Sequence, residues 1–144
     1  MTAPGDPQDQ LIRQLVAKWN TLAATTFAGI RGPYRDEAPS NVTAHPYCVI
    51  KDASGGADSI GSTCKSEQYE SQVEFRVYAK TPEEAATQVA KIDGVFSSQS
   101  LSLVDNGISV IGVRLMRPAY VKADEAVAYG GLTYRFQLSR LKIA

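Results

Sequence analysis

The fold is decided by the segment SQVEFRVYAKTPEEA, residues 71–85, in which a strand pattern changes into a helix start. Apolar and polar side chains alternate from Val73 to Ala79, which is typical of a β-strand with one buried face. Thr81 then supplies an N-cap hydroxyl, Pro82 suits the first helical turn, and a glutamate stands three residues after the cap. The segment therefore predicts a half-buried strand that runs directly into a helix.

The same two periodicities predict elements on both sides of this segment. An amphipathic stripe predicts a first helix over residues 8–24, and the second helix should continue to residue 97. Strands are expected over residues 46–51, 100–104, 108–116 and 132–139, with an Asn-Gly hairpin turn at 106–107. This order predicts an α+β domain, with a mainly antiparallel sheet of four to five strands and both helices packed on one face.

We expect one hydrophobic core between the sheet and the helices. Its predicted members are Val73, Phe75, Val77, Phe136 and Leu138 from the strands, and Leu15, Trp19, Val89 and Ile92 from the helices. Residues 108–116 are apolar at nearly every position, which predicts a strand covered on both faces. Long loops are expected over residues 28–45, 52–68 and 117–128, and loops of that length in a small domain are usually functional.

The composition fits a single domain over residues 1–144. Hydrophobic residues make up 44 %, and 15 basic residues balance 15 acidic ones. This hydrophobic fraction argues against intrinsic disorder. No apolar run approaches the roughly 20 residues of a membrane-spanning helix, and the first residues lack a signal-peptide pattern, so we expect maturation in the cytosol of the producing cell. The zero net charge argues against a dedicated nucleic-acid binder.

Charge is distributed unevenly along the chain. Residues 51–100 have a net charge of −3 and residues 101–144 a net charge of +3. Either the acidic part of one copy attracts the basic part of another copy, or the two parts balance within one molecule. The sequence alone leaves both interpretations open.

No group of side chains has the pattern of a catalytic or metal site. The single histidine, His45, has no nucleophile turn beside it, and Cys48 and Cys64 have no further ligands at zinc spacing. The glycine-rich residues 55–61 lack the Gly-Lys-Ser/Thr end of a phosphate-binding loop. We therefore expect no enzymatic activity, no metal and no cofactor.

The last third of the chain combines cations with tyrosines. Tyr120, Tyr129 and Tyr134 are interleaved with the basic residues Arg114, Arg117, Lys122, Arg135, Arg140 and Lys142. Tyrosine and arginine are enriched at protein interfaces, and aromatic residues among cations also bind single-stranded nucleic acid. The neutral net charge favours the protein interface.

Several short segments, in this order, resemble the tail terminator proteins of long-tailed double-stranded DNA phages, also called tail completion or tail-to-head joining proteins. The segments are DEAP at 36–39, PYCVI at 46–50, the strand and helix start at 69–85, and YGGLTYRF at 129–136. The resemblance covers residues 8–141.

This resemblance implies a virion structural protein that assembles in the host cytoplasm into a ring, a hexamer, on the head-proximal end of the tail tube. Such a ring ends tube polymerisation and joins the tail to the head connector. The implied partners are further copies of the chain, the tail tube protein, the head-closure protein, and double-stranded DNA that passes through the lumen without specific binding. The alternatives are another neck or tail protein, such as a head-closure or tube subunit, and a small single-stranded nucleic-acid-binding domain.

A head-to-tail ring needs two different surfaces that meet, so we predict interface residues from opposite charge and from aromatic character. These are Glu70, Glu74 and Glu83 of one copy near Arg114, Arg135 or Arg140 of the next, with Tyr120 and Tyr129 in the same contact. Asp124 and Glu125, between the last two strands, are predicted to face the lumen, where carboxylates would repel DNA phosphates.

Overall fold

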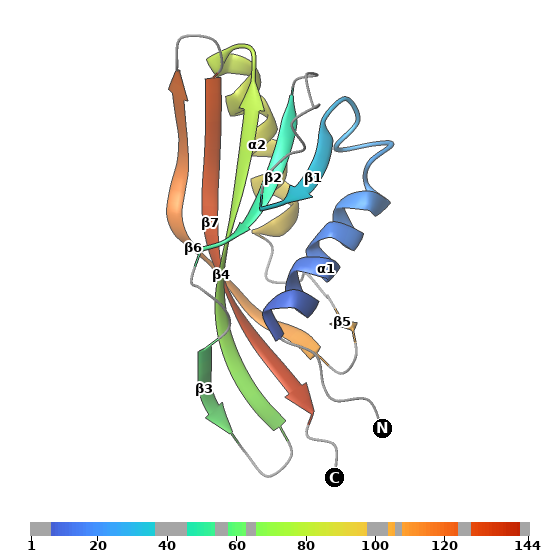
Figure 1. Cartoon of the computed structure of the whole chain (residues 1–144), viewed down its shortest axis with the longest axis vertical. Coiled ribbons are helices and arrows are strands. Elements are labelled where there is room, and N and C mark those ends of the chain that lie inside the picture. Colours follow the sequence, from blue (N-terminus) through green and yellow to red (C-terminus); the bar gives the residue numbers. More distant parts are fainter. Residues whose placement is uncertain are drawn as a thin grey trace.

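The computed structural model of the chain describes residues 7–36, 46–53, 58–62, 66–97, 104–105, 108–123 and 128–141. Two helices and seven strands follow one another along it: α1 (Pro7–Thr21), β1 (Arg31–Arg35), β2 (Tyr47–Asp52), β3 (Asp58–Ser62), β4 (Ser66–Ala79), α2 (Pro82–Phe96), β5 (Val104–Asp105), β6 (Ile108–Ala123) and β7 (Ala128–Leu141). Figure 1 shows the long twisted strands β4, β6 and β7 crossing the molecule, with α2 beside their upper part and α1 beside their middle.

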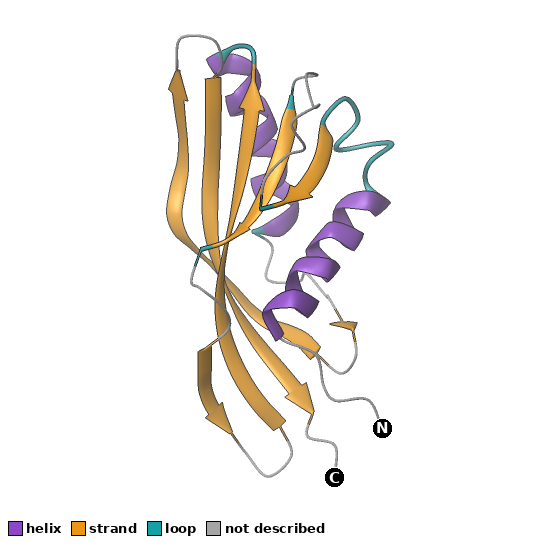
Figure 2. Cartoon of the chain, viewed as in Figure 1, coloured by secondary structure: helices purple, strands orange, loops and turns teal. Residues whose placement is uncertain are grey.

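The described strands form one mixed sheet in the order β1-β2-β4-β7-β6-β5, with β3 paired to β4. Every pair is antiparallel except β1 with β2, which run parallel. The predicted α+β fold is confirmed, and Figure 2 shows its two helices and single sheet. The sheet has more strands than expected, because β1 and β3 lie in segments that were predicted to be loops.

The core lies between one face of the sheet and the two helices. All nine residues predicted for it are buried in one cluster. Phe27 also belongs to this cluster, with its ring stacked 3.8 Å from that of Trp19 and 6.3 Å from that of Phe96, measured between ring centres. Phe27 stands beyond the end of α1, so helical periodicity could not identify it.

The helix signals were accurate at the start of α2 and less so for α1. Thr81 has the extended backbone of an N-cap, and its hydroxyl accepts a hydrogen bond of 3.2 Å from the backbone N–H of Glu84. Helix α1 ends at Thr21, three residues before the expected end. Gln10 and Gln14 of α1 are buried, although an amphipathic helix is expected to bury its apolar side chains.

Two predictions about the C-terminal half were wrong. Residues 117–128 are not a long loop, because β6 continues to Ala123 and β7 begins at Ala128. Residues 108–116 are not covered on both faces: Ile111 is 54 % exposed and Leu115 is 44 % exposed. The reason is the position of β6, which has β7 on one side and, beyond Ser109, no described strand on the other.

Candidate assembly surface

The sheet face that points away from the helices carries a row of tyrosines. Tyr34, Tyr47, Tyr78 and Tyr129 come from the adjacent strands β1, β2, β4 and β7, and the register pairs the last three directly across the sheet. Successive ring centres are 6.2, 5.0 and 6.1 Å apart. The Tyr47 and Tyr78 rings stack on one another, and burial raises the pKa of Tyr47. The four rings therefore form one continuous row of aromatic contacts across these strands.

Most of the predicted interface charges make ion pairs within one chain. Arg135 lies 2.9 Å from Glu70, and both side chains are about a quarter exposed. Arg76 lies 3.0 Å from Glu74, and its guanidinium carbon is 5.8 Å from the centre of the Tyr129 ring. In these two ion pairs, acidic and basic side chains of the same chain therefore neutralise one another.

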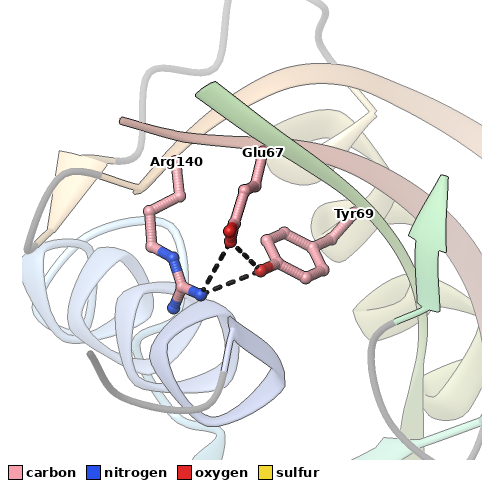
Figure 3. Close-up of polar contacts among 3 residues, drawn as sticks. All are labelled: Glu67, Tyr69 and Arg140. Carbon is pink, nitrogen blue, oxygen red and sulfur yellow. Dashed lines mark hydrogen bonds and ion pairs between the residues drawn. The ribbon is translucent and has the colours of Figure 1, made fainter. Parts of the chain in front are cut away.

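Arg140 belongs to a cluster where β4 begins and β7 ends, at the lower end of the sheet in Figure 1, and Figure 3 shows its polar contacts with Glu67 and Tyr69. Its guanidinium donates a hydrogen bond of 2.8 Å to the Tyr69 hydroxyl and lies 3.3 Å from the Glu67 carboxylate. The Tyr69 hydroxyl also donates to Glu67, and this hydrogen bond raises the pKa of Tyr69. Because the Arg140 side chain is only 13 % exposed, the cluster ties the two strand ends together rather than presenting a free cation.

The remaining predicted residues are distributed over several elements. Glu83 is exposed in the first turn of α2, Glu74 is buried in β4, and Arg114 is exposed on β6. Tyr120 lies in β6 opposite Gly131 by register. Asp124 and Glu125 lie outside the described residues, between the paired ends Ala123 and Ala128.

The tyrosines of the proposed nucleic-acid surface do not lie on one face. Tyr134 is fully buried among the core residues, and its hydroxyl donates a hydrogen bond of 2.6 Å to Asp93 of α2. Burial raises the pKa of Tyr134, as does its hydrogen bond to Asp93. Tyr129 belongs to the row on the opposite face, so Tyr129 and Tyr134 cannot form one stacking platform for bases.

Strand β6 exposes apolar side chains that were not among the interface residues predicted from charge and aromatic character. We define the β6 strip as Ile111, Leu115, Met116 and Val121, which are four of the five large exposed hydrophobic residues in the described parts of the chain. The register skips Ile111 between Val110 and Gly112, and Met116 between Leu115 and Arg117, so both are the extra residues of β-bulges. Pro118, within β6, is a sequence feature that could have indicated an edge strand, because proline cannot donate a hydrogen bond to a neighbouring strand.

An open hollow of about 400 Å³ adjoins this strip. It is lined by Ile111, Gly112, Val113, Arg114, Arg135 and Gln137. This lining combines two cations with an amide and apolar groups, without a nucleophile or a general base. Among the described residues, no group of three or more His, Cys, Asp or Glu side chains could hold a metal ion, and no helix has the length and apolar character needed to cross a membrane.

Comparison with known proteins identifies the fold. No family model and no curated protein matches the chain. A solved chain from the virion of a native gene transfer agent particle is similar over 94 % of this chain and 96 % of that chain, with a TM-score of 0.58 and 20 % identity. A second solved structure, whose name states no function, covers 97 % of this chain and 99 % of its own, with a TM-score of 0.54 and 15 % identity. The chain thus shares its fold, nearly from end to end, with a protein found in a gene transfer agent virion.

Proposed function

We propose that this chain is a structural protein of a phage-like virion and acts as the tail terminator, forming a ring at the head-proximal end of the tail tube. The observation that carries the proposal is the end-to-end fold similarity to a chain of a gene transfer agent virion. The tail-terminator segments at 36–39, 46–50, 69–85 and 129–136 support the finer assignment. The exposed β6 strip supports assembly, because several large apolar side chains exposed along one strand favour an interaction site over singly scattered surface residues.

In this proposal the protein acts by assembly and not by catalysis. A head-to-tail contact repeated with a closing rotation makes a ring, and a hexamer is the expected size. One face of the ring ends the tube and binds the tube protein, and the other face binds the head-closure protein. Glu83 and Arg114, which are exposed, are the candidate charges for contacts between copies, while Glu70, Arg135 and Arg140 also hold one copy together.

Electron microscopy of the purified protein, with its mass in solution, tests the ring. Closed rings of uniform diameter are expected. Long tubes would favour a tube subunit instead, and rings that bind the head connector but not the tail tube would favour a head-closure role. Salt-dependent binding of a single-stranded oligonucleotide by a monomer would instead support the nucleic-acid-binding alternative.

Residence in the virion is tested on particles released by the strain that encodes the chain. Mass spectrometry of purified particles should detect the protein at a constant ratio to the tail tube protein. Deletion of its gene should leave heads and tails unjoined, with tails of irregular length. Normal, joined particles from the deletion strain would refute the proposal.

The lumen assignment of Asp124 and Glu125 is tested by changing their charge. We expect the double change Asp124→Lys and Glu125→Lys to leave rings intact and to slow DNA passage, because lysines would bind the phosphates. The double change to Asn and Gln is the matched control, since it removes charge without adding cations. Normal infectivity of particles with the lysine variant would remove the lumen assignment and leave the ring untouched.

A further inference from the structure

The large exposed hydrophobic residues of the described chain lie on only two strands, at opposite edges of the sheet. Ile60 lies on β3 and is 46 % exposed. The other four of these residues form the β6 strip. Among the described strands, β3 pairs only with β4, and β6 follows on the far side of β7. Figure 1 shows the two edges apart at the lower end of the molecule, with β4 and β7 between them. One chain therefore cannot cover either edge with the other.

Both edges are built to present side chains rather than backbone. Ile60 is skipped by the register between Ser59 and Gly61, just as Ile111 and Met116 are skipped on β6. Three of the five exposed residues are thus the extra residues of bulges. A bulge redirects a side chain and breaks the regular row of backbone donors and acceptors that an added strand would need. The geometry favours docking through side chains over extension of the sheet.

The charges on the two edges decide which surfaces can meet. Strand β6 contains three cations, Arg114, Arg117 and Lys122, and no acid, whereas the only charged residue of β3 is Asp58. Contact between two β6 strands would bring together two segments that each have three basic residues and no acidic residue in their sequence, which disfavours a symmetric pair. Contact between the β6 strip of one copy and the β3 edge of another joins exposed apolar residues of both, and it combines a strand of basic sequence with a strand of acidic sequence.

We propose that the β6 strip of one copy docks against Ile60 on the β3 edge of a second copy, an inference that rests on the ring assembly proposed above. Because the two surfaces differ and lie on opposite edges, each copy binds one neighbour through β6 and another through β3. This is a heterologous contact, which continues from copy to copy until the ring closes. It differs from the pairing of Glu70 with Arg135 between copies, since those two side chains bind one another within the chain.

Cysteine cross-linking tests the contact directly. The background carries Cys64→Ser, and the thiol of Cys48 is fully buried. Ile60→Cys in one tagged copy is mixed with Ile111→Cys, Leu115→Cys or Met116→Cys in another and oxidised, since a disulfide needs Cα atoms within about 7 Å. At least one mixture should give a mixed dimer at tenfold or more the yield of the control mixture of Ile60→Cys with Ala86→Cys, a position exposed on α2. No mixed dimer above that control would overturn the inference, as would efficient dimers of Ile111→Cys with itself.

Disruption of the contact gives an independent readout. Ile60→Asp and Met116→Asp should each raise the protein concentration needed for assembly at least tenfold, while the unfolding midpoint of the monomer stays unchanged. Ala86→Asp is the matched control and should assemble normally. Normal rings from both aspartate variants would overturn this inference and leave the ring function standing. A further outcome is that the protein forms open filaments whose copies cross-link from β3 to β6, and is absent from virions. The cross-links would then support the contact, and the absence from virions would refute the tail-terminator function.

Discussion

Replacing Phe75 with alanine should remove a large part of the stability of the subunit. Phe75 is 1 % exposed in the middle of β4. Its ring centre lies 4.8 Å from that of Phe96 on α2 and 6.1 Å from that of Tyr134 on β7. The side chain is thus enclosed by groups from the helix and from the neighbouring strand, so its removal weakens packing in both the helix layer and the sheet.

The expected magnitude has two parts. Loss of the buried phenyl ring costs about 1.5–3 kcal/mol in transfer free energy. A cavity adds to this loss, because rings held on two other elements cannot collapse fully into the space. The sum is about 3–5 kcal/mol. For a domain of this size, the melting temperature should fall by roughly 10–20 °C.

Equilibrium unfolding in urea is the assay, and Trp19 is a suitable probe because it is the only tryptophan and lies in the same core. With a slope of about 2 kcal/mol per molar urea, the midpoint should fall by roughly 1.5–2.5 M. Measurements at two protein concentrations separate the stability of the subunit from that of any assembly. Phe75→Leu should lose less, and Tyr78→Ala, on the other face of β4, should also lose less. Equal losses for Phe75→Ala and Tyr78→Ala would refute the assignment of the buried face.

Three further predictions concern single contacts. Thr81→Ala should cost about 0.5–2 kcal/mol in thermal unfolding by loss of the N-cap of α2, whereas Thr81→Ser should stay close to wild type. Tyr134→Phe should cost about 1.5–3 kcal/mol in urea unfolding, because Asp93 loses its donor, and an unchanged midpoint would contradict that contact. The hydrogen bond from Arg35 lowers the pKa of Asp9 below its ordinary 3.8, so this contact stabilises the fold above that pH and is lost as the pH falls through the lowered value. Asp9→Asn should therefore flatten the acid side of the stability-against-pH curve, and an unaltered curve would show that the contact contributes nothing.

Features that depend on near neighbours in the chain could be predicted from the sequence. The alternation from Val73 to Ala79 and the cap at Thr81 involve residues only a few positions apart, so local geometry determines them. The predicted core residues are also correct, because a strand or helix with one apolar face must bury that face. Thus the fold class, the nine predicted core residues and the start of α2 followed from pattern alone.

Features of the candidate assembly surface depended on which strands pair. Glu70 and Arg135 were identified from charge, but only the β4–β7 register brings them together within one chain. An apolar run is the same in sequence whether a strand is central or at an edge, so Ile111 and Met116 were expected to be covered. Their exposure, and that of Ile60, follows from edge positions and bulges. Strand order and register are set by contacts between residues far apart in the chain, which no local pattern specifies.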